Sequence, residues 1–193
     1  MPKVGMEPLR RDALVRATIT EIGRAGSLDV TVAQIARRAG MSSALAHHYF
    51  GGKEQIFLAA MRHILTIYGA EVRGALAAAD GPRGRVQAVI RASFSDGSFR
   101  REVVSAWLHF YVLAQTVPEA ARLLGIYQRR LRSNLLAGLR PLAGDQAPGL
   151  ADRLGALIDG VYLREALSGR APDRRAAIRI VEGVLENMLE RRE

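Results

Sequence analysis

The sequence has no cysteine, few aromatic residues and no long apolar run. Without cysteine the chain can form neither a disulfide framework nor a thiolate metal site, and this fits an intracellular protein. The first residues lack the apolar segment that marks a signal peptide. No stretch is long and apolar enough to span a membrane. We therefore expect a cytoplasmic protein.

Patterns typical of catalysis and metal binding are also missing. None of the four histidines lies at zinc-ligand spacing from another histidine or a carboxylate. His47 and His48 are adjacent, so on a helix their side chains point in different directions. The sequence contains no glycine-rich phosphate loop and no nucleophile motif. It therefore predicts a protein that is not an enzyme and that uses no cofactor or metal.

What the sequence does contain is enough apolar residues for a packed core, together with an excess of positive charge. Apolar residues make up 49% of the 193 residues, and the formal net charge is +9. A basic balance suits a nucleic-acid partner. The excess is divided almost evenly between residues 1–63 and the remainder. Charge therefore permits a DNA partner without locating where it binds.

Apolar residues recur at helical spacing along the whole chain, and no segment alternates as a strand does. The pattern predicts an all-α protein of about nine helices. A three-helix helix-turn-helix head is expected at residues 1–53, and a larger helical domain at residues 54–193. Lys3, Arg10 and Arg11 lie at or near the first residues, which form either a basic DNA-binding arm or a plain terminus.

Two further local signals help to divide the larger domain. Thr116 and Glu119 have the spacing of a capping box, with Pro118 inside the first turn of the helix that follows. Residues 141–149 are rich in proline, glycine and alanine, so we expect a loop there. The helices after this loop are apolar on more than one face. Pairing two helices from each of two chains would bury them in a homodimer, and the alternative is that one chain covers both faces itself.

Residues 31–53 carry the clearest local pattern in the chain. Thr31 and Gln34 have capping-box spacing at the start of a short amphipathic helix. Gly40 stands where the chain must adopt positive φ, and Ser42 or Ser43 can cap a second short helix. Two short helices around a glycine turn are the layout of a DNA-binding helix-turn-helix. The spacing alone fits an ordinary helical hairpin equally well.

This stretch resembles the DNA-binding signature of the tetracycline-repressor (TetR) family of bacterial regulators; it reads TVAQIARRAGMSSALAHHYFGGKEQIF. Later segments are similar to the choline-responsive branch of that family, which controls glycine betaine synthesis. They are AWLHFY at 106–111, RRLRSNL at 129–135 and ALIDGVYLREALSG at 156–169, and MPKVGM at the start is similar too. The resemblance implies an all-helical homodimer that binds a palindromic operator as a repressor and is released from it by choline.

The resemblance also implies a set of DNA-facing residues: Thr31, Ser42, Ser43, Ala44, His47, His48, Tyr49 and Lys53. Tyr49 and Lys53 would bind phosphates, Lys53 at a helix start where backbone N–H groups also favour anions. Two positions depart from the family. Ala44 stands where many relatives have glycine, and His47 where many have tyrosine, so the role of His47 stays open.

Aromatic residues gather in the C-terminal part of the chain, near one acidic residue. The candidate ligand-binding residues are Trp107, Phe110, Tyr111, Tyr127, Asp159 and Tyr162. Aromatic faces attract a cation, with about 2 kcal/mol per desolvated contact. The spacing fits core aromatics too, with Asp159 paired to Arg130 or Arg164. The resemblance favours choline, although Tyr111 and Tyr162 stand where that branch often has tryptophan.

The expected mechanism joins these two regions. A ligand acts only through its different affinities for two shapes of the protein. We expect choline to favour a shape in which the helix beginning at Lys53 is swung, which changes the distance between two DNA-binding heads. The alternatives are a repressor of the same family that responds to another small cation, and a ligand-binding protein that does not bind DNA.

Overall fold

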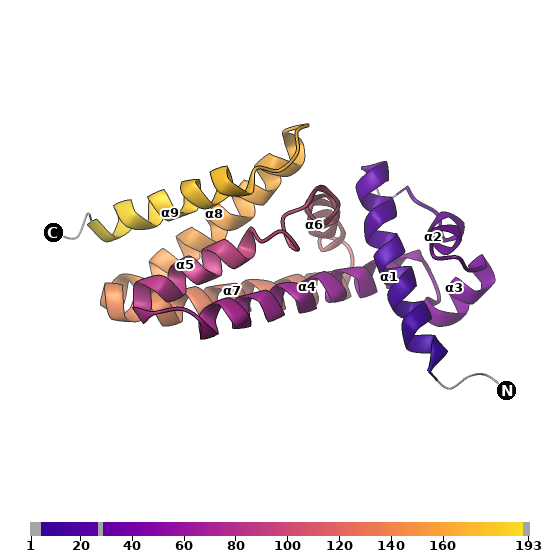
Figure 1. The fold of residues 1–193 in the computed structure, drawn as a ribbon, viewed down its shortest axis with the longest axis horizontal. Helices are drawn as coiled ribbons and strands as arrows, with labels where there is room; N and C mark the ends of the chain where they lie inside the picture. The colour runs from indigo at the N-terminus through magenta and orange to yellow at the C-terminus, as the bar shows by residue number, and fades with distance from the viewer. Residues whose placement is uncertain (1–4, 27–28, 191–193) are drawn as a thin grey trace.

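The computed structural model of the chain describes residues 5–26 and 29–190. Within these ranges it contains only helices, which confirms the all-α prediction (Figure 1). They are α1 (Met6–Ala25), α2 (Val32–Arg38), α3 (Ser43–Phe50), α4 (Lys53–Ala77), α5 (Gly81–Ser93), α6 (Arg101–Leu113), α7 (Pro118–Ala143), the 3-10 turn η1 (Gly144–Gln146), α8 (Ala147–Leu167) and α9 (Arg174–Glu190). No helix in the described ranges is long and apolar enough to cross a membrane.

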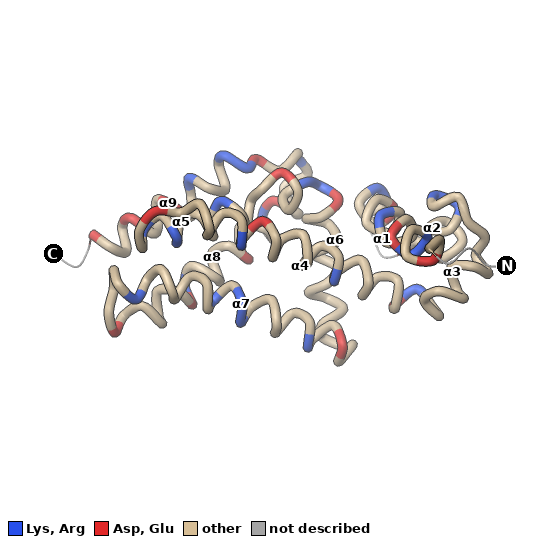
Figure 2. The backbone as a smooth tube through the Cα atoms, turned by 60° about the horizontal axis from the view of Figure 1, so that its bottom comes forward, with Lys and Arg blue, Asp and Glu red and all other residues tan. Residues whose placement is uncertain are grey.

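The helices form a small head at one end of an elongated body (Figure 1). Helices α1 to α3 make the head, and α4 begins there and then runs along the body. In the body α7 packs against α5 and α8, and α9 covers α5 and α8. Helix α6 packs against both α1 and α8, so it joins the head to the body. Basic positions are spread over both parts, as the sequence indicates (Figure 2).

Local sequence signals set the bounds of the head helices. The capping box at Thr31 is confirmed, because its Oγ1 accepts from the Gln34 N–H at 3.1 Å and Gln34 Oε1 accepts from the Thr31 N–H at 2.6 Å. Gly40, between α2 and α3, has φ 69°. Ser42 caps α3 by accepting from the Leu45 N–H at 3.2 Å. The two short helices and their turn therefore form as the sequence predicts.

Two expectations for the body are wrong. Residues 141–149 are not a loop, because α7 continues through Pro141 and α8 already begins at Ala147. Pro148 fits in the first turn of α8, where a missing N–H costs little, whereas Pro141 stands inside the last turn of α7 and removes one backbone hydrogen bond there. Thr116 forms no capping box: the residue before α7 is Val117, and the Thr116 hydroxyl donates back to the Leu113 carbonyl at 3.4 Å.

The head is seated on the body by a close crossing of α1 and α6. A Cβ built on Gly23 of α1 would lie 2.5 Å from the Cβ and 2.6 Å from the Cα of Glu102. No real side chain tolerates such distances to backbone atoms, so the crossing requires glycine. Leu14 and Ile22, on the same helix, are fully buried. The core of the head and that of the body are therefore continuous through this crossing.

Replacing Gly23 with alanine should force α1 away from α6. We expect Gly23→Ala to lower the free energy of unfolding by about 1–3 kcal/mol, the usual cost of overpacking, as measured by denaturant unfolding. The control is Gly74→Ala in α4, where a Cβ meets no atom within 4 Å. That change should stabilise the protein by about 0.5–1 kcal/mol through helix propensity. Equal stabilisation by both changes would contradict the close crossing.

Candidate functional site

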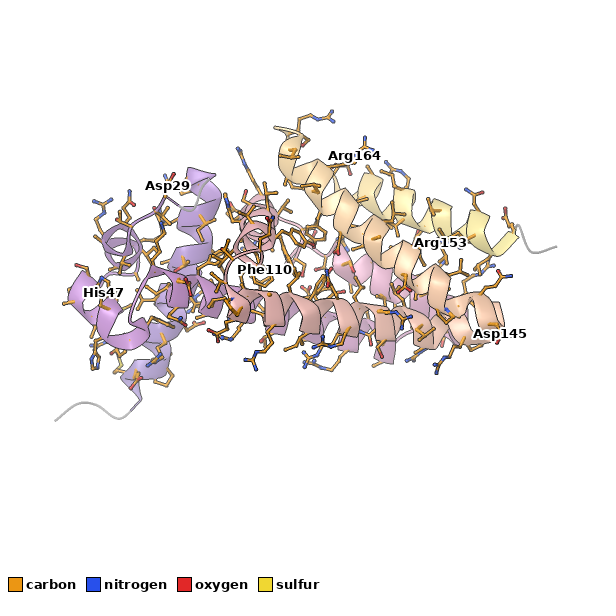
Figure 3. The ribbon with its side chains drawn as sticks, turned by 180° about the vertical axis from the view of Figure 1, so that it is seen from behind. Asp29, His47, Phe110, Asp145, Arg153 and Arg164 are labelled. Atoms are coloured by element: carbon orange, nitrogen blue, oxygen red, sulfur yellow. The ribbon has the colours of Figure 1, made fainter. Side chains whose placement is uncertain are left out.

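Helix α3 carries an exposed polar face at the outer end of the head, where His47 is labelled (Figure 3). The exposed residues in and just before it are Ser42, Ser43, Ala44, His47 and His48, and Tyr49 is half-buried. Ala46 is fully buried and anchors the opposite face to the core. Because the first residues of α3 are short, its backbone can come close to another surface. A helix of this kind can enter a DNA major groove.

His47 is held by its own helix. Its Nδ1 donates to the carbonyl of Gly51 at 3.0 Å, which satisfies one of the free carbonyls at the end of α3. Gly51 has φ 80° and ends the helix. His47 therefore stabilises the end of α3 through its Nδ1. Its Nε2 forms no hydrogen bond to another described residue.

Two arginines from α1 lie against the end of α3. The Arg11 guanidinium carbon lies 5.4 Å from the centre of the Tyr49 ring and 5.1 Å from that of Phe50. Arg10 Nη1 is 3.5 Å from the Tyr49 hydroxyl. Both arginines belong to α1, which begins at Met6, so they are not part of an extended arm. Lys3, the other residue proposed for the arm, lies outside the described residues.

The start of α4 adds a second group of atoms with the chemistry to bind an anion. Lys53 is its exposed first residue, preceded by Gly52, and no side chain caps the helix. The first N–H groups of a helix have no partner within it, and they favour an anion. Thr31, at the start of α2, is exposed too, although its hydroxyl already accepts from Gln34.

A second cluster of side chains surrounds a cavity inside the body. The cavity has a volume of about 10 Å³, which is room for one water molecule. It is lined by Tyr68, Ser93, Ser98, Trp107, Tyr111, Tyr127 and Tyr162. We call these residues the aromatic cage. Its members come from α4, α5, the segment after α5, α6, α7 and α8, so the cage exists only in the folded chain.

The rings of the cage are in direct contact. The centre of the Trp107 ring is 4.6 Å from that of Tyr127 and 6.3 Å from that of Tyr162. Tyr68 approaches Tyr127 at 5.8 Å. Phe110, also predicted as a ligand residue, is fully buried and packs edge-on against Trp107 without lining the cavity (Figure 3). The structure therefore brings four of the five predicted aromatics together and places the fifth behind them.

Asp159 of α8 contacts the cage through Tyr127 but does not line its cavity. Its Oδ1 accepts from the Tyr127 hydroxyl at 3.0 Å. Burial raises the pKa of this carboxyl above its usual range, while hydrogen bonds from Tyr127 and Tyr111 act in the opposite direction. Among the described residues Asp159 forms no ion pair with Arg130 or Arg164, so the alternative pairing is wrong. A half-buried carboxylate beside aromatic rings suits a cation.

Sequence reasoning missed three cage residues, Tyr68, Ser93 and Ser98. Tyr68 shares a hydrogen bond of 3.1 Å with the Ser93 hydroxyl, and the Tyr162 hydroxyl donates to the Ser98 carbonyl at 3.1 Å. Tyr68 was detectable, because it is one of only five tyrosines. The serines carried no signal. In the part of the chain that the structure describes, no group of acidic or histidine residues could hold a metal ion.

Known sequence families match both parts of the chain. The family described as "Bacterial regulatory proteins, tetR family" matches residues 14–60. The family described as "BetI-type transcriptional repressor, C-terminal" matches residues 82–190. The first range contains α2 and α3, and the second contains every cage residue except Tyr68.

Individual relatives agree with these matches. The chain is 51% identical over 183 residues to the HTH-type transcriptional regulator BetI of Brucella anthropi, covering 94% of each chain. It is 50% identical to the regulator of the same name from Rhizobium meliloti, covering 94% of this chain and 90% of that one. A regulator from Pseudomonas aeruginosa PAO1 has a similar structure, with TM-score 0.77, 27% identity and coverage of 95% and 91%.

A structural likeness also extends to a transcriptional regulator from Saccharomonospora viridis, solved in complex with choline. The TM-score is 0.79 and the sequence identity 22%, over 91% of this chain and 95% of that one. At this identity the likeness shows a shared fold. The sequence relatives named BetI thus cover 94% of the chain, including the head and the cage.

The cage makes the stability of the protein sensitive to alkali. Burial raises the pKa of Tyr68 to about 12 and holds that of Tyr127 well above its usual value. Above pH 10 the unfolded chain loses phenolic protons that the folded chain keeps, so the free energy of unfolding should fall as pH rises.

We expect Tyr127→Phe to flatten this fall by about 1.4 kcal/mol per pH unit between roughly pH 10.5 and 12. The measurement is urea unfolding across that range. Trp107→Phe, which changes a ring of the cage but removes no phenol, should leave the slope as it is. An unchanged slope in Tyr127→Phe would contradict the burial of this hydroxyl.

Proposed function

The chain belongs to the TetR family of bacterial regulators, with a BetI-type C-terminal domain, and we propose that it represses genes for choline-to-glycine-betaine synthesis until choline binds. It is thus a regulator and not an enzyme. The observation that carries the choline proposal is the cage of Trp107 and four tyrosines, with the half-buried carboxylate of Asp159 bonded to Tyr127. In this proposal the protein acts in the cytoplasm, where its operator lies.

The proposed DNA contact uses the outer face of the head. Helix α3 enters the major groove through Ser42, Ser43 and Ala44, while Tyr49 and Lys53 hold phosphates. Such contacts fix the register of the protein on the duplex. The arginines of α1 beside Tyr49 add positive charge next to this contact. Support comes from the exposure of Ser42, Ser43, Ala44 and Lys53 and from the uncapped start of α4.

A helix-turn-helix repressor reads two half-sites about one helical turn apart, so it needs two heads. We propose that a homodimer forms through α8 and α9. Leu163 and Leu167 of α8 and Ile180 of α9 are 44%, 68% and 52% exposed, although each is large and apolar. Pairing these faces in a second copy would remove them from water.

Choline fits the cage by its chemistry. Its trimethylammonium group offers no N–H donor, so it is bound by aromatic faces and by a carboxylate charge rather than by directed hydrogen bonds. A cation beside Asp159 also favours the ionised carboxylate, whose burial is otherwise unfavourable. The alternative effector is another small quaternary ammonium, since Tyr111 and Tyr162 shape the cage differently from tryptophan.

The small cavity supports a mechanism for release. With room for about one water molecule, the cage cannot take choline unless its rings move apart. Tyr68 belongs to α4, the helix whose first residue, Lys53, is proposed to hold a phosphate. Choline therefore has different affinities for the closed and the opened cage, and opening shifts α4 and the head with it.

The DNA contacts are tested by binding to the sequence upstream of the gene cluster that contains this gene. Tyr49→Ala and Lys53→Ala should each weaken binding severalfold. Lys53→Ala should also lower the slope of log affinity against log salt by about 1, because one phosphate contact is lost. Arg140→Ala, which removes a charge from the exposed end of α7, is the control and should change neither. Binding that is unaffected by both head variants would refute the assignment.

The ligand is tested by calorimetric titration with choline, followed by release from the same DNA. Asp159→Asn should weaken choline binding by about 2 kcal/mol, or roughly 30-fold, through loss of the buried charge. Asp152→Asn, on the same helix but exposed and paired with Arg132, should leave it unchanged. No heat and no release with choline would reject choline as effector, and the DNA test would still stand. Heat with another quaternary ammonium alone would favour the alternative effector.

A further inference from the structure

A groove lies between α4 and α7, beside the aromatic cage, with a volume of about 550 Å³. The two helices run in the same direction. The ion pair of Arg62 with Glu119 joins them near the head, and Tyr68 meets Tyr127 further along. The groove follows α4 from Arg62 to Leu76, which spans about 21 Å at 1.5 Å per residue. It is therefore long enough for an extended molecule.

The groove has an apolar floor. Its apolar lining residues are Leu65, Val72, Leu76, Leu123 and Ile126. All of these except the fully buried Val72 are half-buried, so their side chains stay partly open to water. Covering apolar surface that is exposed to water contributes about 25 cal/mol per Å² to the free energy of binding. The floor therefore favours a ligand with an apolar body.

The rim of the groove is positive. Arg62, Arg73 and Arg130 line it, and none of the described residues that line it is an aspartate or a glutamate. Arg62 is paired with Glu119, but Arg73 and Arg130 form no ion pair within residues 5–26 and 29–190. Arg73 folds back over the groove, because a Cβ built on Gly69 would lie 3.3 Å from its Nη1. The free positive charge opposes a cation and favours an anion.

We propose that this groove binds an amphipathic carboxylate, such as a medium-chain fatty acid, as a second ligand. The carboxylate lies between Arg73 and Arg130, where a guanidinium can donate two parallel hydrogen bonds. The alkyl chain lies over Ile126 and Leu123 toward Leu65 and the head. The ligand differs from the proposed effector in its charge, its shape and the residues that hold it.

Tyr68 and Tyr127 line both the groove and the cage. A ligand in the groove therefore rests on the outer side of two rings whose inner side faces the cage. Movement of these rings changes the affinity of the cage for its ligand, and by linkage each ligand changes the affinity for the other by the same factor. The groove is thereby a place where a second metabolite class can adjust the response of the regulator.

The test uses the full chain without DNA or choline, so its outcome does not depend on the proposed function. Octanoate is titrated by calorimetry and by the emission of Trp107, the only tryptophan, whose ring lies 4.6 Å from Tyr127. We expect saturable binding at one site per chain. Hexanoate should bind more weakly by about fourfold per methylene removed. The uncharged 1-octanol should bind at least tenfold more weakly than octanoate.

The matched variants are Arg130→Gln and Arg129→Gln, which remove the same charge from neighbouring positions of α7. Arg129 lines a different crevice, next to Asp152 and Asp159, and is absent from the groove. Arg130→Gln should weaken octanoate binding at least tenfold, and Arg129→Gln should leave it unchanged. Binding that does not saturate, that is equal for 1-octanol, or that survives Arg130→Gln would overturn the proposal.

Discussion

One unbroken helix, α4, connects the proposed DNA contact, the aromatic cage and the groove beside it. Lys53 begins α4 in the head, Tyr68 of the same helix is a wall of the aromatic cage, and Arg73 rims the groove beside it. Each backbone N–H within a helix is bonded four residues back, so bending costs hydrogen bonds and the helix moves as a rod. A displacement at Tyr68 therefore reaches Lys53, about 23 Å away.

Besides α4, a second contact attaches the head to the body, namely the crossing of α1 and α6. Gly23 of α1 lies directly on the backbone of Glu102 in α6, and α6 also supplies Trp107 and Tyr111 to the cage. The head is thus held at two points, and each point belongs to a helix that carries cage residues. In the proposed mechanism, a shift of α4 relative to α6 would therefore rotate the head.

The structure of the head could be predicted from the sequence more completely than that of the cage. The capping box at Thr31, the positive φ of Gly40 and the cap at Ser42 are local features, so short-range rules find them. The cage depends on how six segments pack. Helical spacing could not show that Phe110 stands behind Trp107, nor that Ser98 meets Tyr162. The prediction of a loop at residues 141–149 was wrong because a proline near a helix end gives the same sequence signal as a proline in a loop.

In the proposed function, the closed cage also limits the rate at which the effector binds. A cation that meets this protein finds no open site, because the rings already fill the space. Association then waits for the cage to open, and it proceeds more slowly than collision allows. The same rings must part again before the cation leaves. In the proposed function, the packing of these rings would therefore slow both the binding and the release of the effector.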